Sequence, residues 1–267
     1  MKWERLLKRW PWAVVFFSVA LVGSQMYACT TKPAPPESDI PYANVWSADA
    51  GVDLFTRGAE LIRASHESAW LVKNGGLSRA YSGYREALVD IGDESKMEYF
   101  FTQTEKGTRG PDWVKDANEN FYEHITAYSA DDKTVTATVC QYVVPTKGLE
   151  KGPTQSNILT LDMSVVDIRL ENSSSQPGKA GIANRDPAKH DPAAHRPPRW
   201  NVFGTWKITR ISRNRDSDPE GCKVWFKQQL PDLREVPESK LLKVPDSFGI
   251  LPQPLAAQYP EWVGPVN

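Results

Sequence analysis

The 267-residue sequence has few cysteines and no strong excess of charge of either sign. Three cysteines in a chain of this length exclude a small scaffold that is held together by disulfides. The formal net charge is −1, which excludes an overall basic field of the kind that binds nucleic acid. The sequence also lacks a phosphate-binding glycine loop, a Gly-x-Ser-x-Gly nucleophile elbow and a His-Glu-x-x-His zinc motif. We therefore expect no metal, no cofactor and no nucleic-acid partner.

The charge is unevenly distributed along the chain. Residues 1–28 carry a charge of +3, which leaves −4 on the remainder. After the basic start, the run from Trp10 to Gly23 contains no charged residue. A basic segment followed by an apolar one is the layout of a bacterial secretory signal. Because the basic flank stays in the cytoplasm, we expect the rest of the chain outside it.

The end of this segment, Met26-Tyr27-Ala28-Cys29, resembles the lipobox of bacterial lipoproteins. The resemblance implies that Cys29 carries diacylglycerol and holds the protein at the extracytoplasmic face of the cell membrane. A polar, proline-rich stretch follows, which suits an extended tether. Two alternatives stay open: an uncleaved membrane anchor over residues 10–29 and ordinary secretion. All three place residues 30–267 outside the cytoplasm.

The other two cysteines, Cys140 and Cys222, are most simply interpreted as one disulfide in an exported protein. The alternative is a pair of buried free thiols.

Hydrophobic periodicity divides the rest of the chain into a helical part and a strand-rich part. It predicts helices at about 54–72, 77–91 and 111–120, then a hairpin of strands 121–128 and 134–144. Further strands are expected at 158–170 and 200–212. In the first of these the apolar phase changes between Val165 and Val166, which predicts a β-bulge.

This order predicts an α+β fold in which N-terminal helices pack on a curved antiparallel sheet. The expected organisation is a signal peptide or anchor at 1–28, a Pro-rich tether at 29–47, and a single domain at 48–230. That domain contains a mobile loop at 172–199, and residues 231–267 form an extended Pro-rich tail.

Helices followed by a long bent sheet resemble the cone-shaped nuclear-transport-factor-two-like fold, and small exported lipoproteins of actinomycetes often look like this. The resemblance covers roughly residues 48–227 and consists of the order of elements alone. It implies a cone that encloses a pocket. The residues that we expect to line this pocket are Phe55, Trp70, Tyr81, Tyr84, Met163 and Trp206.

Some enzymes of this fold, the ketosteroid isomerases, use a pocket carboxylate as a base with an acid opposite it. The carboxylates that could serve are Asp162 and Asp167, with a hydroxyl from Tyr81, Tyr84, Tyr122 or Tyr142. His190 and His195 lie in the expected mobile loop, without the fixed geometry that a metal site needs. His66 is expected to be a partly exposed helix residue. We do not expect the protein to be an enzyme.

The function expected from the sequence is binding at the membrane surface. The protein would be an accessory or scaffold subunit of a cell-envelope complex, or the carrier of an apolar ligand. A prophage-borne surface-exclusion protein is a further alternative. Trp46 and Trp262 lie in Pro-rich segments that have no core of their own, so each either docks on the domain or contacts a partner.

Overall fold

The computed structural model describes residues 42–89, 96–113, 117–146, 163–174, 181, 194–195, 197–214, 220–235, 242–243 and 253–264. The predicted signal segment, Cys29 and most of the predicted loop at 172–199 lie outside these residues. Within the described ranges no helix is both long enough and apolar enough to cross a membrane.

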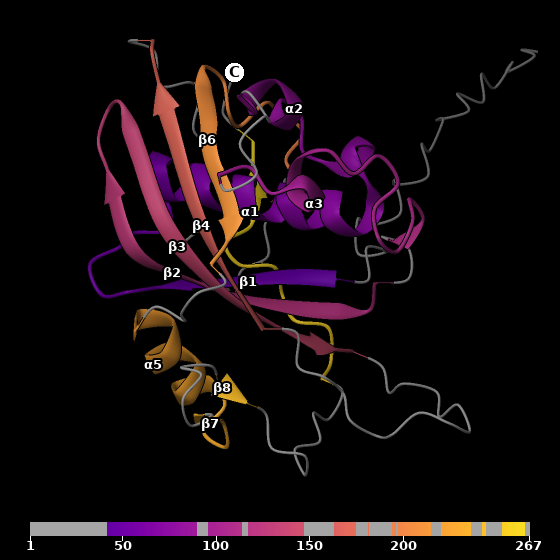
Figure 1. Ribbon diagram of the computed structural model, residues 1–267, viewed down its shortest axis with the longest axis vertical. Coiled ribbons are helices and arrows are strands. Elements are labelled where there is room, and N and C mark those ends of the chain that lie inside the picture. Colours follow the sequence, from indigo (N-terminus) through magenta and orange to yellow (C-terminus); the bar gives the residue numbers. More distant parts are fainter. Residues whose placement is uncertain are drawn as a thin grey trace, which may run out of the picture. The chain divides into compact units, whose positions relative to one another are not determined.

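A five-stranded mixed sheet forms the centre of the fold (Figure 1). The strand order is β1-β2-β3-β4-β6, and every neighbouring pair is antiparallel except β1 and β2, which run parallel. The strands are β1 (Tyr42–Ala48), β2 (Glu119–Ala130), β3 (Thr134–Pro145), β4 (Met163–Asn172) and β6 (Trp206–Arg213). The predicted α+β class is therefore confirmed. The prediction of a purely antiparallel sheet is wrong, because β1 runs beside β2 in the same direction.

One long helix, α1 (Arg57–Gly75), lies across the sheet (Figure 1). It begins at the N-cap Thr56, whose side chain accepts from the amide of Ala59. The second predicted helix, at 77–91, is much shorter than expected. It consists of a 3-10 turn, η2 (Leu77–Arg79), and a single helical turn, α2 (Tyr84–Ala87). Gly83 separates the two with a φ of 83°, a backbone conformation that ends helical continuity and favours glycine.

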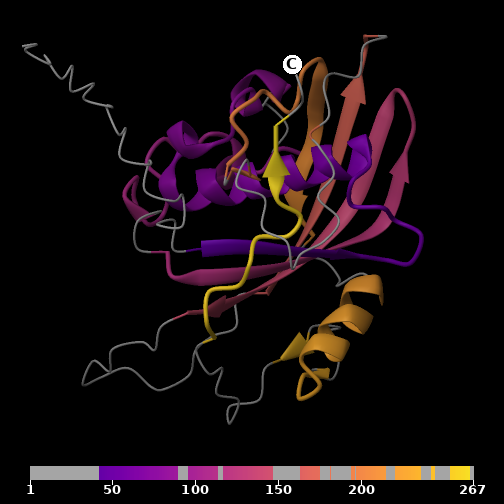
Figure 2. The same cartoon turned by 180° about the vertical axis from the view of Figure 1, so that it is seen from behind.

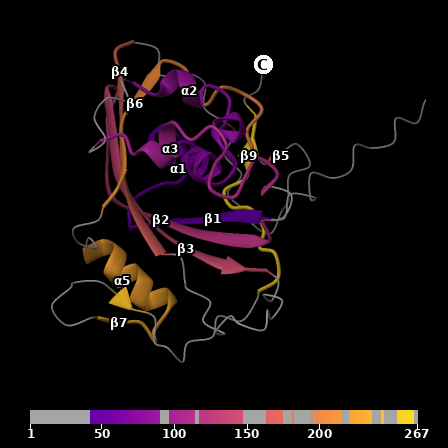
Figure 3. The same ribbon diagram turned by 45° about the vertical axis from the view of Figure 1, so that its right-hand side comes forward.

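Both faces of the sheet are covered (Figure 2 and Figure 3). On the inner face, α1, α2 and a third short helix, α3 (Tyr99–Thr102), complete the main core. On the outer face, α5 (Glu220–Gln229) packs through Cys222, Trp225 and Phe226. The expected disulfide between Cys140 and Cys222 is present and joins β3 to α5.

Coverage of both faces explains why the bulge was predicted in the wrong strand. Val165 and Val166 are both buried because Val165 packs in the outer cluster and Val166 in the main core. The pairing of β3 with β4 runs regularly through these positions. The irregularity lies instead between β4 and β6, where Ile208 pairs with Leu170 and Arg210 with Arg169. The extra residue, Thr209, therefore belongs to β6.

The domain extends beyond the predicted boundaries 48–230 at both ends. Residues 42–47, predicted to be tether, form most of β1. In the predicted tail, residues 253–264 lie along β1, with the Tyr259 amide and carbonyl bonded to Asn44 and Trp46. Two small sheets complete the fold: β5 (Ala194–His195) with β9 (Trp262–Val263), labelled in Figure 3, and β7 (Arg234–Glu235) with β8 (Leu242–Lys243).

Candidate functional site

A buried carboxylate, that of Glu67 in the middle of α1, joins segments from both ends of the domain. It accepts hydrogen bonds from the side chains of Asn44 at 3.1 Å, Trp46 at 2.9 Å and Trp262 at 3.0 Å. The hydroxyl of Tyr81 donates a fourth. Two of these donors lie in β1 and one in β9. The Glu67 cluster, defined as these five residues, therefore fastens β1 and the C-terminal segment to α1.

The charge of this cluster is balanced by a buried arginine. Arg63 is 3% exposed, lies one turn before Glu67, and places its guanidinium 4.3 Å from the centre of the Trp262 ring. Burial raises the pKa of Glu67, while Arg63 and the hydrogen bonds from Tyr81, Trp262 and Trp46 oppose that rise. Burial and the neighbouring Glu67 carboxyl raise the pKa of Tyr81 well above its usual value, so Tyr81 remains a donor.

A second buried carboxyl, that of Glu123 on β2, lies beside the first. The indole N–H of Trp70 can only donate, and it lies 3.1 Å from Nε2 of His66. Nε2 is therefore unprotonated, and Nδ1 carries the hydrogen that points to Oε1 of Glu123 at 3.2 Å. Gln141 donates to the same oxygen at 3.3 Å. His66 is fully buried, not partly exposed as expected, because α1 is enclosed on all sides.

Burial sets the protonation states of this pair. It lowers the pKa of His66 to about 3, with Lys73 adding a smaller effect, so the imidazole is neutral at physiological pH. Burial and the charge of Glu67 raise the pKa of Glu123 well above its usual value. Its Oε2 has no hydrogen-bond partner among the residues described by the structure. The observed contacts thus suit a protonated Glu123 carboxyl beside Glu67, whose donors and nearby Arg63 favour its ionised form.

The pH dependence of stability tests this assignment. A carboxyl whose native pKa lies above 4.5, its value in the unfolded chain, stabilises the fold less as pH rises from 4.5 toward that native pKa. We therefore expect the stability of Glu123→Gln relative to wild type to increase over this range, by at most about 1.4 kcal/mol per pH unit. Urea unfolding from about pH 4 to about pH 7 measures it. A difference that does not change with pH would contradict the raised pKa.

A small cavity adjoins the Glu67 cluster. This cavity, lined by Arg63, Trp262, Glu60 and Gly181 among others, has a volume of about 10 Å³. That volume is enough for about one water molecule. All four donors to Glu67 come from the protein itself, so the arrangement is suited to holding segments together.

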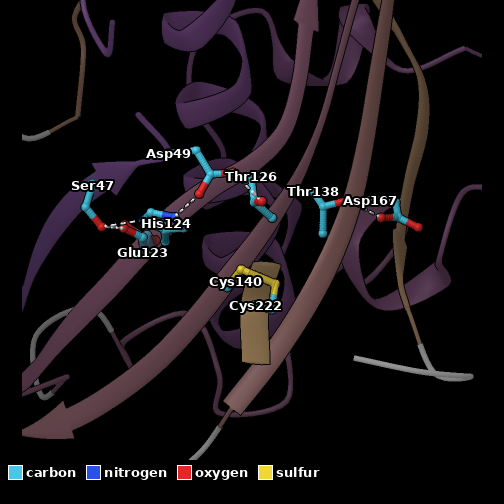
Figure 4. The surroundings of a disulfide bond; sticks show 9 residues. All are labelled: Ser47, Asp49, Glu123, His124, Thr126, Thr138, Cys140, Asp167 and Cys222. Atoms are coloured by element: carbon cyan, nitrogen blue, oxygen red, sulfur yellow. Dashed lines mark hydrogen bonds and ion pairs between the residues drawn. A yellow bond between two sulfur atoms is a disulfide. The ribbon is translucent and has the colours of Figure 1, made fainter. Parts of the chain in front are cut away.

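A second polar cluster lies on the outer face of the sheet near the disulfide (Figure 4). His124 on β2 contacts Ser47 Oγ through Nδ1 at 2.9 Å and Asp49 Oδ1 through Nε2 at 3.0 Å. Thr126 donates to the other oxygen of Asp49 at 2.5 Å. Burial alone raises the pKa of Asp49, but the hydrogen bonds from Thr126 and His124 outweigh it and lower that pKa.

This order of serine, histidine and aspartate resembles a hydrolytic triad, but its position suits a structural role. Ser47 and His124 are directly opposite each other in the β1–β2 pairing, and Ser47 Oγ also lies 3.2 Å from the Glu123 carbonyl. The His124 ring is stacked under Trp225 of α5, with ring centres 5.2 Å apart. The cluster therefore connects β1, β2 and α5.

The six residues expected to line a pocket are divided between the two faces of the sheet. Trp70, Tyr81, Tyr84 and Trp206 are buried on the inner side of the sheet, and Phe55 is partly buried against the main core. Met163 packs with the outer cluster, on the opposite face. Met163 is thus separated by the sheet from the other five residues of the expected pocket.

Of the two carboxylates expected for the enzymatic alternative, only Asp167 is among the described residues, and it does not lie in the main core. Asp167 lies on the outer face, where it accepts from Thr138 at 2.9 Å and lies 3.4 Å from Arg210. Tyr122 and Tyr142 stack on each other on that same face, at 4.9 Å. Asp162, His190 and Cys29 lie outside the described residues. His195 pairs with Trp262 in the β5–β9 sheet, and no group of three metal-binding side chains occurs among the described residues.

Sequence reasoning did not identify Glu67 or Glu123 as buried. The one available signal was the number of tryptophans outside the predicted helices and strands, because an indole N–H needs an acceptor when it is buried. Trp46 and Trp262 both dock on the domain, and both donate to Glu67. Comparison with protein-family models, with curated proteins and with solved structures found no match to this chain.

Proposed function

We propose that this protein is a lipoprotein of the bacterial cell envelope that acts by binding. Diacylglycerol on Cys29 would hold the domain at the extracytoplasmic face of the membrane, where it would serve as a scaffold or accessory subunit of an envelope complex. The domain would belong to the nuclear-transport-factor-two-like class, with its sheet wrapped around α1. The anchor would raise the effective concentration of the domain near a membrane-bound partner.

The disulfide is the observation that carries the extracytoplasmic assignment. Cys140 and Cys222 are both fully buried and are bonded to each other. Such bonds persist in oxidising compartments and are rare in the cytoplasm. The N-terminal segment, with its basic start and apolar run, is consistent with export to such a compartment.

The packed interior favours a scaffold over a carrier. Aromatic residues expected to surround an apolar ligand pack against other aromatic side chains of the core, for example Tyr84 against Phe203 at 5.7 Å and Trp70 against Phe101 at 6.2 Å. A carrier of a drug-sized ligand needs a cavity of about 300 Å³ or more. We therefore place the binding function on the surface of the domain.

Two measurements in intact cells test the proposal. A palmitate analogue should label the wild-type chain and should not label Cys29→Ala. Crosslinking followed by mass spectrometry should then recover the protein with an envelope partner. Absence of label on the wild-type chain would reject lipidation, and a protein that is labelled but crosslinks to nothing would reject the scaffold role.

A further inference from the structure

Two adjacent aromatic side chains are exposed on α3. Tyr99 is 49% and Phe100 is 40% exposed, and their rings contact each other edge to face, with centres 5.9 Å apart. Large apolar side chains next to each other on a surface often mark an interaction site. By contrast, Val224 on α5 and Leu255 are exposed singly.

The residues on either side of this aromatic pair, Tyr99 and Phe100, are held in place by β6 and by the core. The preceding residue, Glu98, accepts two hydrogen bonds from the Arg213 guanidinium, at 2.6 and 2.8 Å, and one from the Arg213 amide. The following residue, Phe101, is fully buried, and Met97 forms a β-bridge with Ile211. The turn that presents the pair is thus fixed to β6 before any partner binds, which lowers the entropic cost of docking.

The pair lies at the end of α1 where the described chain begins. A continuous series of ring contacts runs from Phe101 through Trp70 and Phe121 to Tyr42, with centres 6.0 to 6.4 Å apart. In Figure 1, α3 and the start of β1 both lie toward the right, near the C-terminal end of α1. The start of β1 and the aromatic pair therefore both lie toward the C-terminal end of α1, on the sides of the two opposite edge strands, β1 and β6.

We propose that the aromatic pair docks into the interface of the membrane to which the chain is tethered; this inference rests on the proposed lipid anchor. Tyr42 follows Cys29 by thirteen residues, which span at most about 45 Å when fully extended. The end of the domain that carries the pair is thus held within reach of the bilayer. Aromatic side chains favour the headgroup level, where tyrosine keeps its hydroxyl in water.

The test uses the full-length chain in vesicles of phosphatidylcholine and phosphatidylglycerol. Tyr99→Cys, labelled with an environment-sensitive fluorophore without reducing the disulfide, reports contact with lipids that carry a nitroxide at the headgroup or along the acyl chain. Val224→Cys is the matched control, since Val224 is 47% exposed and lies on α5, on the other side of the sheet. We expect quenching at position 99 to exceed that at 224 several-fold, and Phe100→Ser to reduce it.

Each outcome separates this proposal from the one on which it rests. Equal quenching at 99 and 224, or none at either, overturns membrane docking even when Cys29 carries lipid. Selective quenching at 99 in a chain without lipid on Cys29 supports docking and rejects lipidation. A change at 99 only when envelope proteins are added to the vesicles assigns the surface to a protein and also overturns the proposal.

Discussion

Replacing Glu67 with glutamine is expected to lower the free energy of unfolding by about 3–5 kcal/mol. The carboxylate accepts from Trp46 through Oε1 and from Asn44, Tyr81 and Trp262 through Oε2. A glutamine amide must place its NH₂ group at one of these two positions. In either orientation an indole N–H then faces another donor, and neither group can accept. Arg63 also loses its nearby buried counter-charge.

Glu123→Gln is the matched control for this prediction, because it is the same substitution at an equally buried position. Both donors to Glu123 approach Oε1, so a glutamine there keeps an acceptor for them. Urea unfolding near neutral pH measures both variants, and hydrogen exchange should show faster opening of β1 and β9 in Glu67→Gln. A Glu67→Gln loss no larger than that of Glu123→Gln would show that the Glu67 cluster does not hold these segments.

Removing the disulfide is expected to cost roughly 4–5 kcal/mol, the value that the chain-entropy model gives for a loop of this length. The bond joins residues separated by 82 positions and fixes α5 to β3. In Cys140→Ala/Cys222→Ala, α5 keeps the stacking of Trp225 on His124 and its packing on Tyr142. We therefore expect the helix to remain in place but to open more often than α1.

The measurement is unfolding of the double variant beside that of the wild type, with and without reductant. Reductant should lower the midpoint of the wild type and leave that of the variant unchanged. Hydrogen exchange should rise in α5 before it rises in α1. If the wild type and the variant unfold at the same urea concentration without reductant, the bond has no net stabilising effect.

The elements that the sequence predicted well are those whose burial is one-sided. At the start of β3, buried Val135 and Ala137 alternate with less buried Thr134 and Thr136, and the hairpin was predicted to within a few residues; farther along, β3 is buried on both faces. The helix α1 was predicted in its middle, but its charged residues Glu60 and Arg63 are buried. Periodicity assumes that charged residues face water, and it fails where a helix is enclosed on every side.

The Glu67 cluster could not be predicted from the sequence, because local patterns do not show which charged residues become buried. Glu67 is surrounded by donors from residues 44, 46, 81 and 262, and no local pattern brings such distant positions together. The disulfide could be predicted from the sequence, because only two cysteines remain once Cys29 is set aside, and they can pair in one way. The parallel strand β1 could not be predicted, because it follows a proline-rich segment. Such a segment suggests a tether until its partner strand is known.

The Glu67 cluster also has a consequence for the order of events during synthesis. The last donor, Trp262, follows Glu67 by 195 residues. At about 5–20 residues per second, a ribosome needs about 10–40 s to make that length of chain. Until then the carboxylate lacks one of its two indole partners, and the C-terminal segment cannot yet lie along β1. An unfinished chain thus lacks contacts that close the core, and the domain cannot complete its fold until its last residues have been made.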